Sequence, residues 1–155
     1  MSTALAKDVA TTTKAALAAA VGTGQVGVTP QPMPELNGLL LQLPGAAPVY
    51  LVLNGYRCWV PDSATYSSLF VNGATIVQDI NIGVVSEGPA ISSGAVLAQA
   101  NGSAPVYLVT NGEKMWIPSP AIFSRYQFNS SNINGCAPII INSVPNGPDL
   151  QGPTS

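Results

Sequence analysis

The sequence predicts a mainly β fold, with minor α content, in which one structural unit occurs twice in tandem behind an N-terminal helical arm. Two stretches, 38–62 and 95–119, align without a gap and agree at about half of their positions. The matching positions include Tyr, Trp and Pro, so low complexity does not explain the agreement. Each stretch also contains an Asn-Gly pair flanked by β-branched and aromatic residues, which is typical of a β-hairpin. We therefore expect one duplicated domain over 38–150, with repeat 1 at 38–91 and repeat 2 at 95–150.

Each repeat is expected to form a three-stranded meander followed by a short helix. Both positions of the Asn-Gly turn require positive φ, which Asn and Gly tolerate best. A proline ends the third strand, and Asp62 or Ser119 then stands where a helix N-cap is needed. The expected strands are 39–43, 48–52 and 56–60, then 96–100, 105–109 and 113–117, with helices at 63–70 and 120–127 and shorter strand-like pieces at 76–82 and 138–142.

A repeat of ~50 residues is too small to bury its apolar face alone. The two repeats are therefore expected to pack with pseudo-twofold symmetry and to share one core.

Residues 1–37 are interpreted as an N-terminal arm made of a helix and a linker. Alanine dominates 3–21 and favours a helix, which Gly22 and Gly24 end. Three prolines make 22–37 an extended linker. The helix has a narrow apolar face, so we expect it to need a partner surface on its own body or on a neighbour. The tail 151–155 is expected to be mobile.

The composition excludes several classes of partner. Only 8% of the residues are charged, the net charge is −2, and the five basic residues form no cluster, so nucleic-acid binding is not expected. No apolar run approaches the ~20 residues of a membrane-spanning helix. The first 21 residues lack the uninterrupted apolar core of a conventional signal peptide. A turn-rich, weakly charged chain fits an extracellular protein, or one at the surface of a particle or cell.

The residues that usually carry catalysis are scarce. The chain has no histidine, and its seven carboxylates lie singly, so neither a common general base nor a metal-ligand spacing is present. We therefore expect no enzyme activity, no metal and no cofactor. Cys58 and Cys136 match no metal or redox spacing. Pairing between them stays open, but Met115 stands at the position equivalent to Cys58, which favours a small core residue there.

Binding is more plausible than catalysis because each repeat places a tryptophan beside a basic residue on one face of the third strand. The candidate ligand-binding residues are Tyr50, Arg57 and Trp59 in the first repeat and Tyr107, Lys114 and Trp116 in the second. An exposed Trp beside Arg or Lys can stack on a sugar ring, while the basic side chain donates hydrogen bonds to the sugar hydroxyls. The other interpretation, which we prefer, is that both Trp residues are buried in the core and that the basic side chains cover their rings.

The recurring pattern Val-Tyr-Leu-Val-x-Asn-Gly-x-Lys/Arg-x-Trp-Ile/Val-Pro, followed by Ala and Phe or Tyr, resembles accessory repeats of bacterial exported and surface-associated proteins. The residues that carry the resemblance are 49–64 with Tyr66, and 106–121 with Phe123. The resemblance implies a non-catalytic module with cell-wall or surface association.

The expected function is surface recognition or adhesion, with a surface glycan or cell-wall polymer as the ligand. The alternative is a structural subunit of a larger assembly, such as a virion or injection-particle decoration protein, a coat or a filament. That subunit would contact a protein partner or its own copies through residues 1–37.

Overall fold

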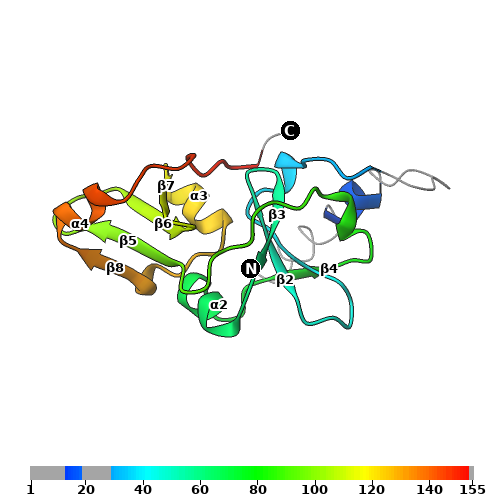
Figure 1. Ribbon diagram of the computed structural model, residues 1–155. Coiled ribbons are helices and arrows are strands. Elements are labelled where there is room, and N and C mark those ends of the chain that lie inside the picture. Colours follow the sequence, from blue (N-terminus) through cyan, green and yellow to red (C-terminus); the bar gives the residue numbers. More distant parts are fainter. Residues whose placement is uncertain (1–12, 19–28, 154–155) are drawn as a thin grey trace.

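The computed structural model describes residues 13–18 and 29–153, and it is mostly β with two four-stranded mixed sheets and few helices. The two sheets lie side by side in Figure 1, and the short helices lie around them. The first sheet contains β1 (Leu40–Gln42), β2 (Val49–Leu53), β3 (Tyr56–Val60) and β4 (Ile76–Gln78). The second sheet contains β5 (Val96–Ala100), β6 (Val106–Thr110), β7 (Glu113–Ile117) and β8 (Ile133–Cys136). The prediction of a β-rich fold is confirmed.

Both sheets follow one plan, with the orders β3-β2-β1-β4 and β7-β6-β5-β8. The three predicted strands of each repeat pair antiparallel. A fourth strand then pairs parallel with the first strand of the repeat, so each meander is extended to four strands. The order leaves β3 and β7 as edge strands, and these carry the two tryptophans.

One predicted strand is wrong. Residues 138–142 were expected to be strand-like, but Pro138–Ser143 forms the helix α4, and the fourth strand is the preceding segment β8. Three successive isoleucines favour a strand locally. Pro138 instead occupies the first turn of a helix, where its fixed φ is suitable and its missing N–H costs nothing. Burial of Ile141 against the second sheet then stabilises α4.

The predicted turns and helix starts are confirmed. Asn54 and Asn111 have φ values of 49° and 55°, and the glycine after each is also at positive φ. The helix α2 (Ser63–Leu69) begins after Asp62, and α3 (Pro120–Arg125) begins after Ser119. Both caps accept a hydrogen bond from the backbone N–H three residues later, which satisfies one free donor of the helix.

The main hydrophobic cluster takes residues from both sheets, so the two repeats share one core. An aromatic group lies at its centre: the Phe128 ring centroid is 5.5 Å from that of Tyr126 and 5.7 Å from that of Phe70. Cys58 and Met115 both face this core, as expected for equivalent apolar positions. Neither cysteine is in a disulfide.

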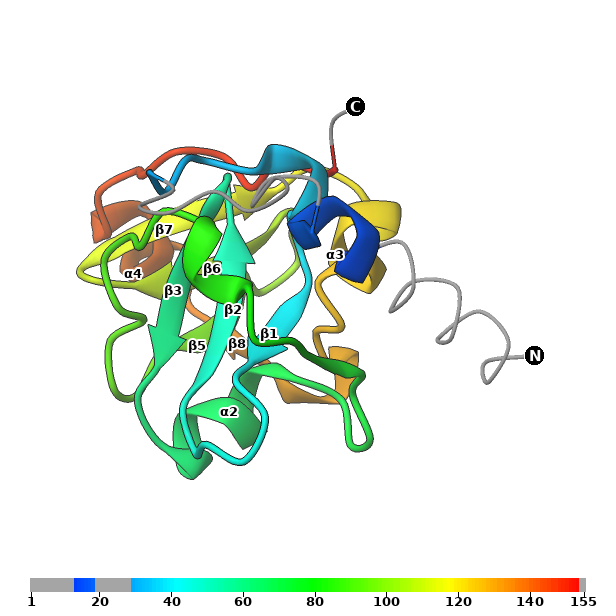
Figure 2. The ribbon, with the colours of Figure 1, turned by 90° about the vertical axis from the view of Figure 1, so that its right-hand side faces the viewer.

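Each sheet is also covered on its outer face. In Figures 1 and 2 the helical residues 13–18 lie against the first sheet, and in Figure 1 α4 lies on the far side of the second. Leu17 is fully buried in a cluster with Leu41 and Val52. The 3-10 helices η1 (Pro34–Leu36) and η2 (Ile82–Val84) belong to the same cover, and η3 (Ser130–Asn132) precedes β8. The remainder of the predicted helix, from 3 to 12 and from 19 to 21, lies outside the described residues.

Candidate ligand-binding pockets

The two tryptophans are half-exposed, with 41% of Trp59 and 40% of Trp116 accessible to solvent. The interpretation of both as core residues is therefore wrong. Each Trp lies on the outer face of an edge strand, directly opposite a tyrosine of the neighbouring strand: Tyr50 pairs with Trp59, and Tyr107 with Trp116. The outer hydrophobic clusters include those tyrosines but do not extend to the indoles.

The basic side chains beside the tryptophans contact a neighbouring tyrosine ring and a backbone carbonyl of the same repeat. The guanidinium of Arg57 lies 5.0 Å from the Tyr50 ring centroid, and its Nε donates to the carbonyl of Val85 at 2.9 Å. Its Nη2 is 4.0 Å from a carboxylate oxygen of the exposed Glu87. Each cation of the pair Arg57 and Lys114 therefore covers a tyrosine ring rather than a tryptophan ring.

Lys114 makes the equivalent contacts in the second repeat. Its Nζ lies 5.6 Å from the Tyr107 ring centroid and donates to the carbonyl of Val144 at 2.6 Å. Only 7% of this lysine is exposed, so its charge is satisfied inside the protein. The hydrogen bonds to Val85 and Val144 fasten the C-terminal part of each repeat to the outer face of its own sheet.

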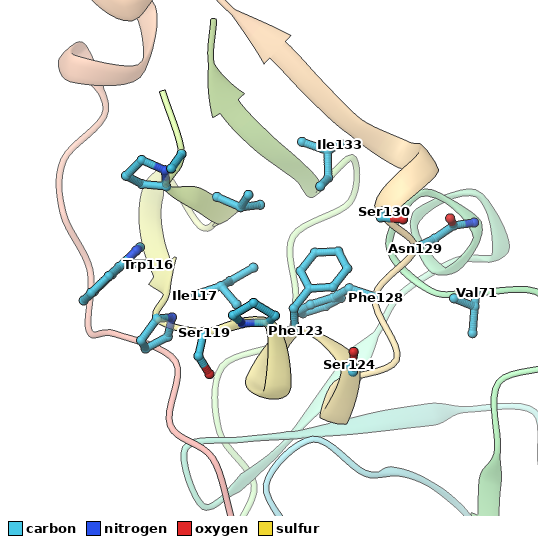
Figure 3. Close-up of a pocket in the computed structure, with 15 residues that line it drawn as sticks. Val71, Trp116, Ile117, Ser119, Phe123, Ser124, Phe128, Asn129, Ser130 and Ile133 are labelled. Atoms are coloured by element: carbon cyan, nitrogen blue, oxygen red, sulfur yellow. The ribbon is translucent and has the colours of Figure 1, made fainter. Parts of the chain in front are cut away.

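Each Trp instead forms one wall of a cavity. The first-repeat pocket has a volume of about 420 Å³ and lies between the start of β2, the end of β3 and α2. The second-repeat pocket has a volume of about 660 Å³ and lies between the equivalent parts of β6, β7 and α3. In Figure 3, Trp116 stands on one side of this cavity, and Phe123 and Phe128 lie across from it.

The two pockets have matching walls. Every residue that lines the first-repeat pocket has a counterpart lining the second, at the same separation that relates Trp59 to Trp116. The counterparts extend beyond the aligned stretches, because Ile76 of β4 corresponds to Ile133 of β8. The second-repeat pocket is larger and is bounded in addition by Phe128, by the residues just after it and by Val71 of the first repeat.

Of the six predicted site residues, the structure places only the tryptophans in the pocket walls. Tyr50, Arg57, Tyr107 and Lys114 lie beside the pockets and support the strands. Sequence reasoning missed the other walls, such as the paired prolines Pro48 and Pro105 and the ring of Tyr66 or Phe123. The signal was present, because these residues recur in the repeated pattern, but Pro48 and Pro105 were interpreted only as the first residues of the strands 48–52 and 105–109.

The polar side chains at the equivalent positions Asp62 and Ser119 of the two pockets make hydrogen bonds within the fold. Asp62 accepts from the backbone N–H of Thr65 at 2.7 Å and from the hydroxyl of Ser93 at 2.6 Å. The Ser93 hydrogen bond, followed by those from Thr65, lowers the pKa of the Asp62 carboxyl, so the group is ionised at neutral pH. The corresponding Ser119 caps α3 without a charge.

The described residues contain no group of three or more metal-binding side chains. Burial raises the pKa of the Cys58 thiol to about 11, which leaves it a weak nucleophile at neutral pH. Burial also raises the pKa of the Tyr126 phenol, whose hydroxyl donates to the carbonyl of Gln151 at 2.7 Å. Among the described helices, none is long and apolar enough to cross a bilayer.

No protein-family model, curated protein or solved structure matches the chain.

Proposed function

We propose that the chain is a non-catalytic recognition module that binds a surface glycan or cell-wall polymer through two equivalent pockets. The observation that carries the proposal is the pair of cavities with matching walls, each bounded by a half-exposed tryptophan. Concave, mostly apolar sites with a few polar groups are typical ligand sites. An indole at the wall of such a site offers a flat apolar face to a sugar ring. Such a module acts outside the cell or at the surface of a particle.

Two sites in one rigid body favour a repeating ligand. When one unit of a polymer is held, the second site meets the next unit at a high effective concentration, so weak single affinities multiply. The contacts between the repeats support a fixed distance between the sites. The Asn54 side chain of repeat 1 donates to the carbonyl of Asp149 at 3.0 Å, and the Asn111 side chain of repeat 2 donates to that of Ala90 at 3.1 Å.

These two hydrogen bonds are reciprocal: the turn of each repeat binds the C-terminal segment of the other repeat. That segment is also fixed at the tryptophan strand of its own repeat, because Ile91 N–H donates to the carbonyl of Trp59 and Leu150 N–H to that of Trp116. The reciprocity supports packing of the repeats about a pseudo-twofold axis, which stays part of the proposal.

The test is binding to a glycan array that contains peptidoglycan fragments and oligomers of glucosamine and N-acetylglucosamine. Trp59→Ala and Trp116→Ala are each expected to lower avidity, and the double variant is expected to lose binding. Tyr56→Ala is the matched control, because Tyr56 is 41% exposed on the same strand as Trp59 but does not line the pocket. The proposal fails if the wild-type chain binds no glycan, or if the control loses as much avidity as the Trp variants.

A second candidate function, a subunit of a larger assembly, is favoured by an exposed apolar patch on α4. Ile139 is 78% exposed and Ile140 is 55% exposed, and side chains of this size are usually covered. The described part of the N-terminal arm contributes less to this proposal, because Leu17 is buried against the chain's own first sheet. Size-exclusion chromatography with light scattering tests the idea: the wild-type chain forms oligomers that the Ile139→Ser, Ile140→Ser variant does not form.

A further inference from the structure

The two pockets match in shape but differ in charge at one position. Asp62 lines the first-repeat pocket, and its counterpart Ser119 lines the second. Both residues cap a helix in the same way. The cap requires only an oxygen acceptor, which Ser provides as well as Asp. The helix cap by itself therefore does not require a negative charge, and the charge gives the first-repeat pocket an electrostatic property that the second lacks.

The carboxylate of Asp62 is available to a ligand. The side chain is exposed, and its two hydrogen-bond donors, Thr65 and Ser93, are neutral groups. The one ion pair among residues 13–18 and 29–153 joins Arg57 to Glu87, so no basic side chain of the described chain neutralises Asp62. An ionised carboxylate can accept several hydrogen bonds, and two of its acceptor positions are used here.

The aromatic walls also differ, and the first-repeat pocket is again the more polar of the two. Tyr66 of the first-repeat pocket presents a phenol where the second presents the phenyl ring of Phe123. Ser63 likewise stands where the second-repeat pocket has Pro120. The first-repeat pocket thus combines an indole, a phenol and an uncompensated carboxylate. That combination binds ammonium groups, because the ring faces attract a cation and the carboxylate accepts its N–H donors.

We propose that the pockets are specialised: the first-repeat pocket takes an ammonium-bearing sugar unit, and the second-repeat pocket takes an uncharged unit. The inference rests on the proposed function, since it names the ligand chemistry of those same two sites. A polymer that mixes free-amine and N-acetylated sugar units presents both kinds of unit on one strand. The module would then be oriented on it by Asp62.

The chain contains two tryptophans, one at each pocket, so two indole N–H signals in a ¹H–¹⁵N spectrum report the two sites separately. Trp59→Phe and Trp116→Phe assign the signals. Titration with a glucosamine trimer, at a pH that keeps its amines protonated, is compared with titration by the N-acetylglucosamine trimer. The amine trimer is expected to bind about two- to fivefold more tightly at Trp59 than the acetylated trimer, which is the range for an exposed ion pair. At Trp116 the amine trimer has no advantage.

Substitutions at the two helix N-caps, Asp62 and Ser119, provide a matched pair of variants. Asp62→Asn keeps a good N-cap but removes the charge, and it is expected to abolish the amine preference at Trp59. Ser119→Asp is expected to create that preference at Trp116. A lysine tripeptide serves as a cationic probe without a sugar ring, and it is expected to shift the Trp59 signal less than the amine trimer.

The outcomes separate this inference from the function on which it rests. If both trimers shift both indoles equally, and Asp62→Asn changes nothing, the specialisation is refuted while glycan binding stands. If neither trimer shifts either signal, both proposals are refuted. If the lysine peptide binds at Trp59 more tightly than the amine trimer, the ligand of that pocket is a cationic peptide and the sugar assignment is refuted.

Discussion

Replacement of Phe128 by alanine tests whether the two repeats unfold as one body. Phe128 is 3% exposed, and its ring lies near those of Phe70, Phe123 and Tyr126, at centroid distances of 5.7, 5.6 and 5.5 Å. Truncation of a buried Phe to Ala costs about 3–5 kcal/mol, from lost transfer free energy and the cavity that is left. A domain is stable by about 5–15 kcal/mol, so this single change removes a large share. The expected fall in Tm is roughly 6–20 °C, at about 2–4 °C per kcal/mol.

The assay is urea unfolding followed by tryptophan fluorescence in two backgrounds, Trp59→Phe and Trp116→Phe. Each background leaves one indole, which reports the repeat that contains it. Because Phe128 contacts Phe70 of the other repeat, both indoles are expected to show the same lowered midpoint. Phe128→Leu refills most of the space and should cost clearly less. A loss under about 1 kcal/mol, or a Trp116 midpoint well below that of Trp59, would refute the idea of one shared core.

Three further predictions concern the described N-terminal helix, the Asp62 cap and the thiols. Leu17→Ala should cost about 2–5 kcal/mol in thermal or urea unfolding, because Leu17 is fully buried against the first sheet; an unchanged midpoint would show that the helix does not contribute to the fold. The folded-state pKa of Asp62 is lowered, so the ionised carboxylate contributes stability above its unfolded pKa, and this contribution is lost as the pH falls through the folded pKa. The Asp62→Asn variant should lack this part of the acid dependence of Tm. A thiol reagent should label half-exposed Cys136 in the native protein, and buried Cys58, whose pKa is raised to about 11, only after denaturation; equal labelling rates would contradict the structure.

The local structure of each repeat was predictable because local chemistry determines it. The Asn-Gly turns need positive φ, and Asp62 and Ser119 are good helix caps whatever surrounds them. The fourth strand was harder to place because its pairing is non-local. The strand β4 has three residues, and only pairing with β1 makes it a strand. Neither its bounds nor its parallel direction therefore follows from the sequence. At 138–142 the isoleucines favoured a strand, and packing against the second sheet favoured a helix.

The exposure of the tryptophans was not predictable for a different reason. Alternation separates two faces of a strand, but it identifies the buried face only when the other face is solvated. Here both faces of the first sheet are covered, as the complete burial of the neighbours Leu51 and Val52 shows. A Trp on either face therefore has the same sequence signature. The pockets form where α2 and α3 pack beside the ends of the tryptophan strands, and Ile76 of β4 and Ile133 of β8 complete the walls through non-local strand pairing.

The reciprocal hydrogen bonds between each Asn-Gly turn and the C-terminal segment of the other repeat limit how many such units can combine in one body. A pair of repeats satisfies both of its turns and both of its inner faces internally, at Asn54 with Asp149 and at Asn111 with Ala90. A third copy added to the chain would find no free turn to hold its trailing segment and no open core to enter. Longer natural or engineered arrays of this unit should therefore grow two repeats at a time, as closed pairs joined by linkers, rather than as an open-ended stack.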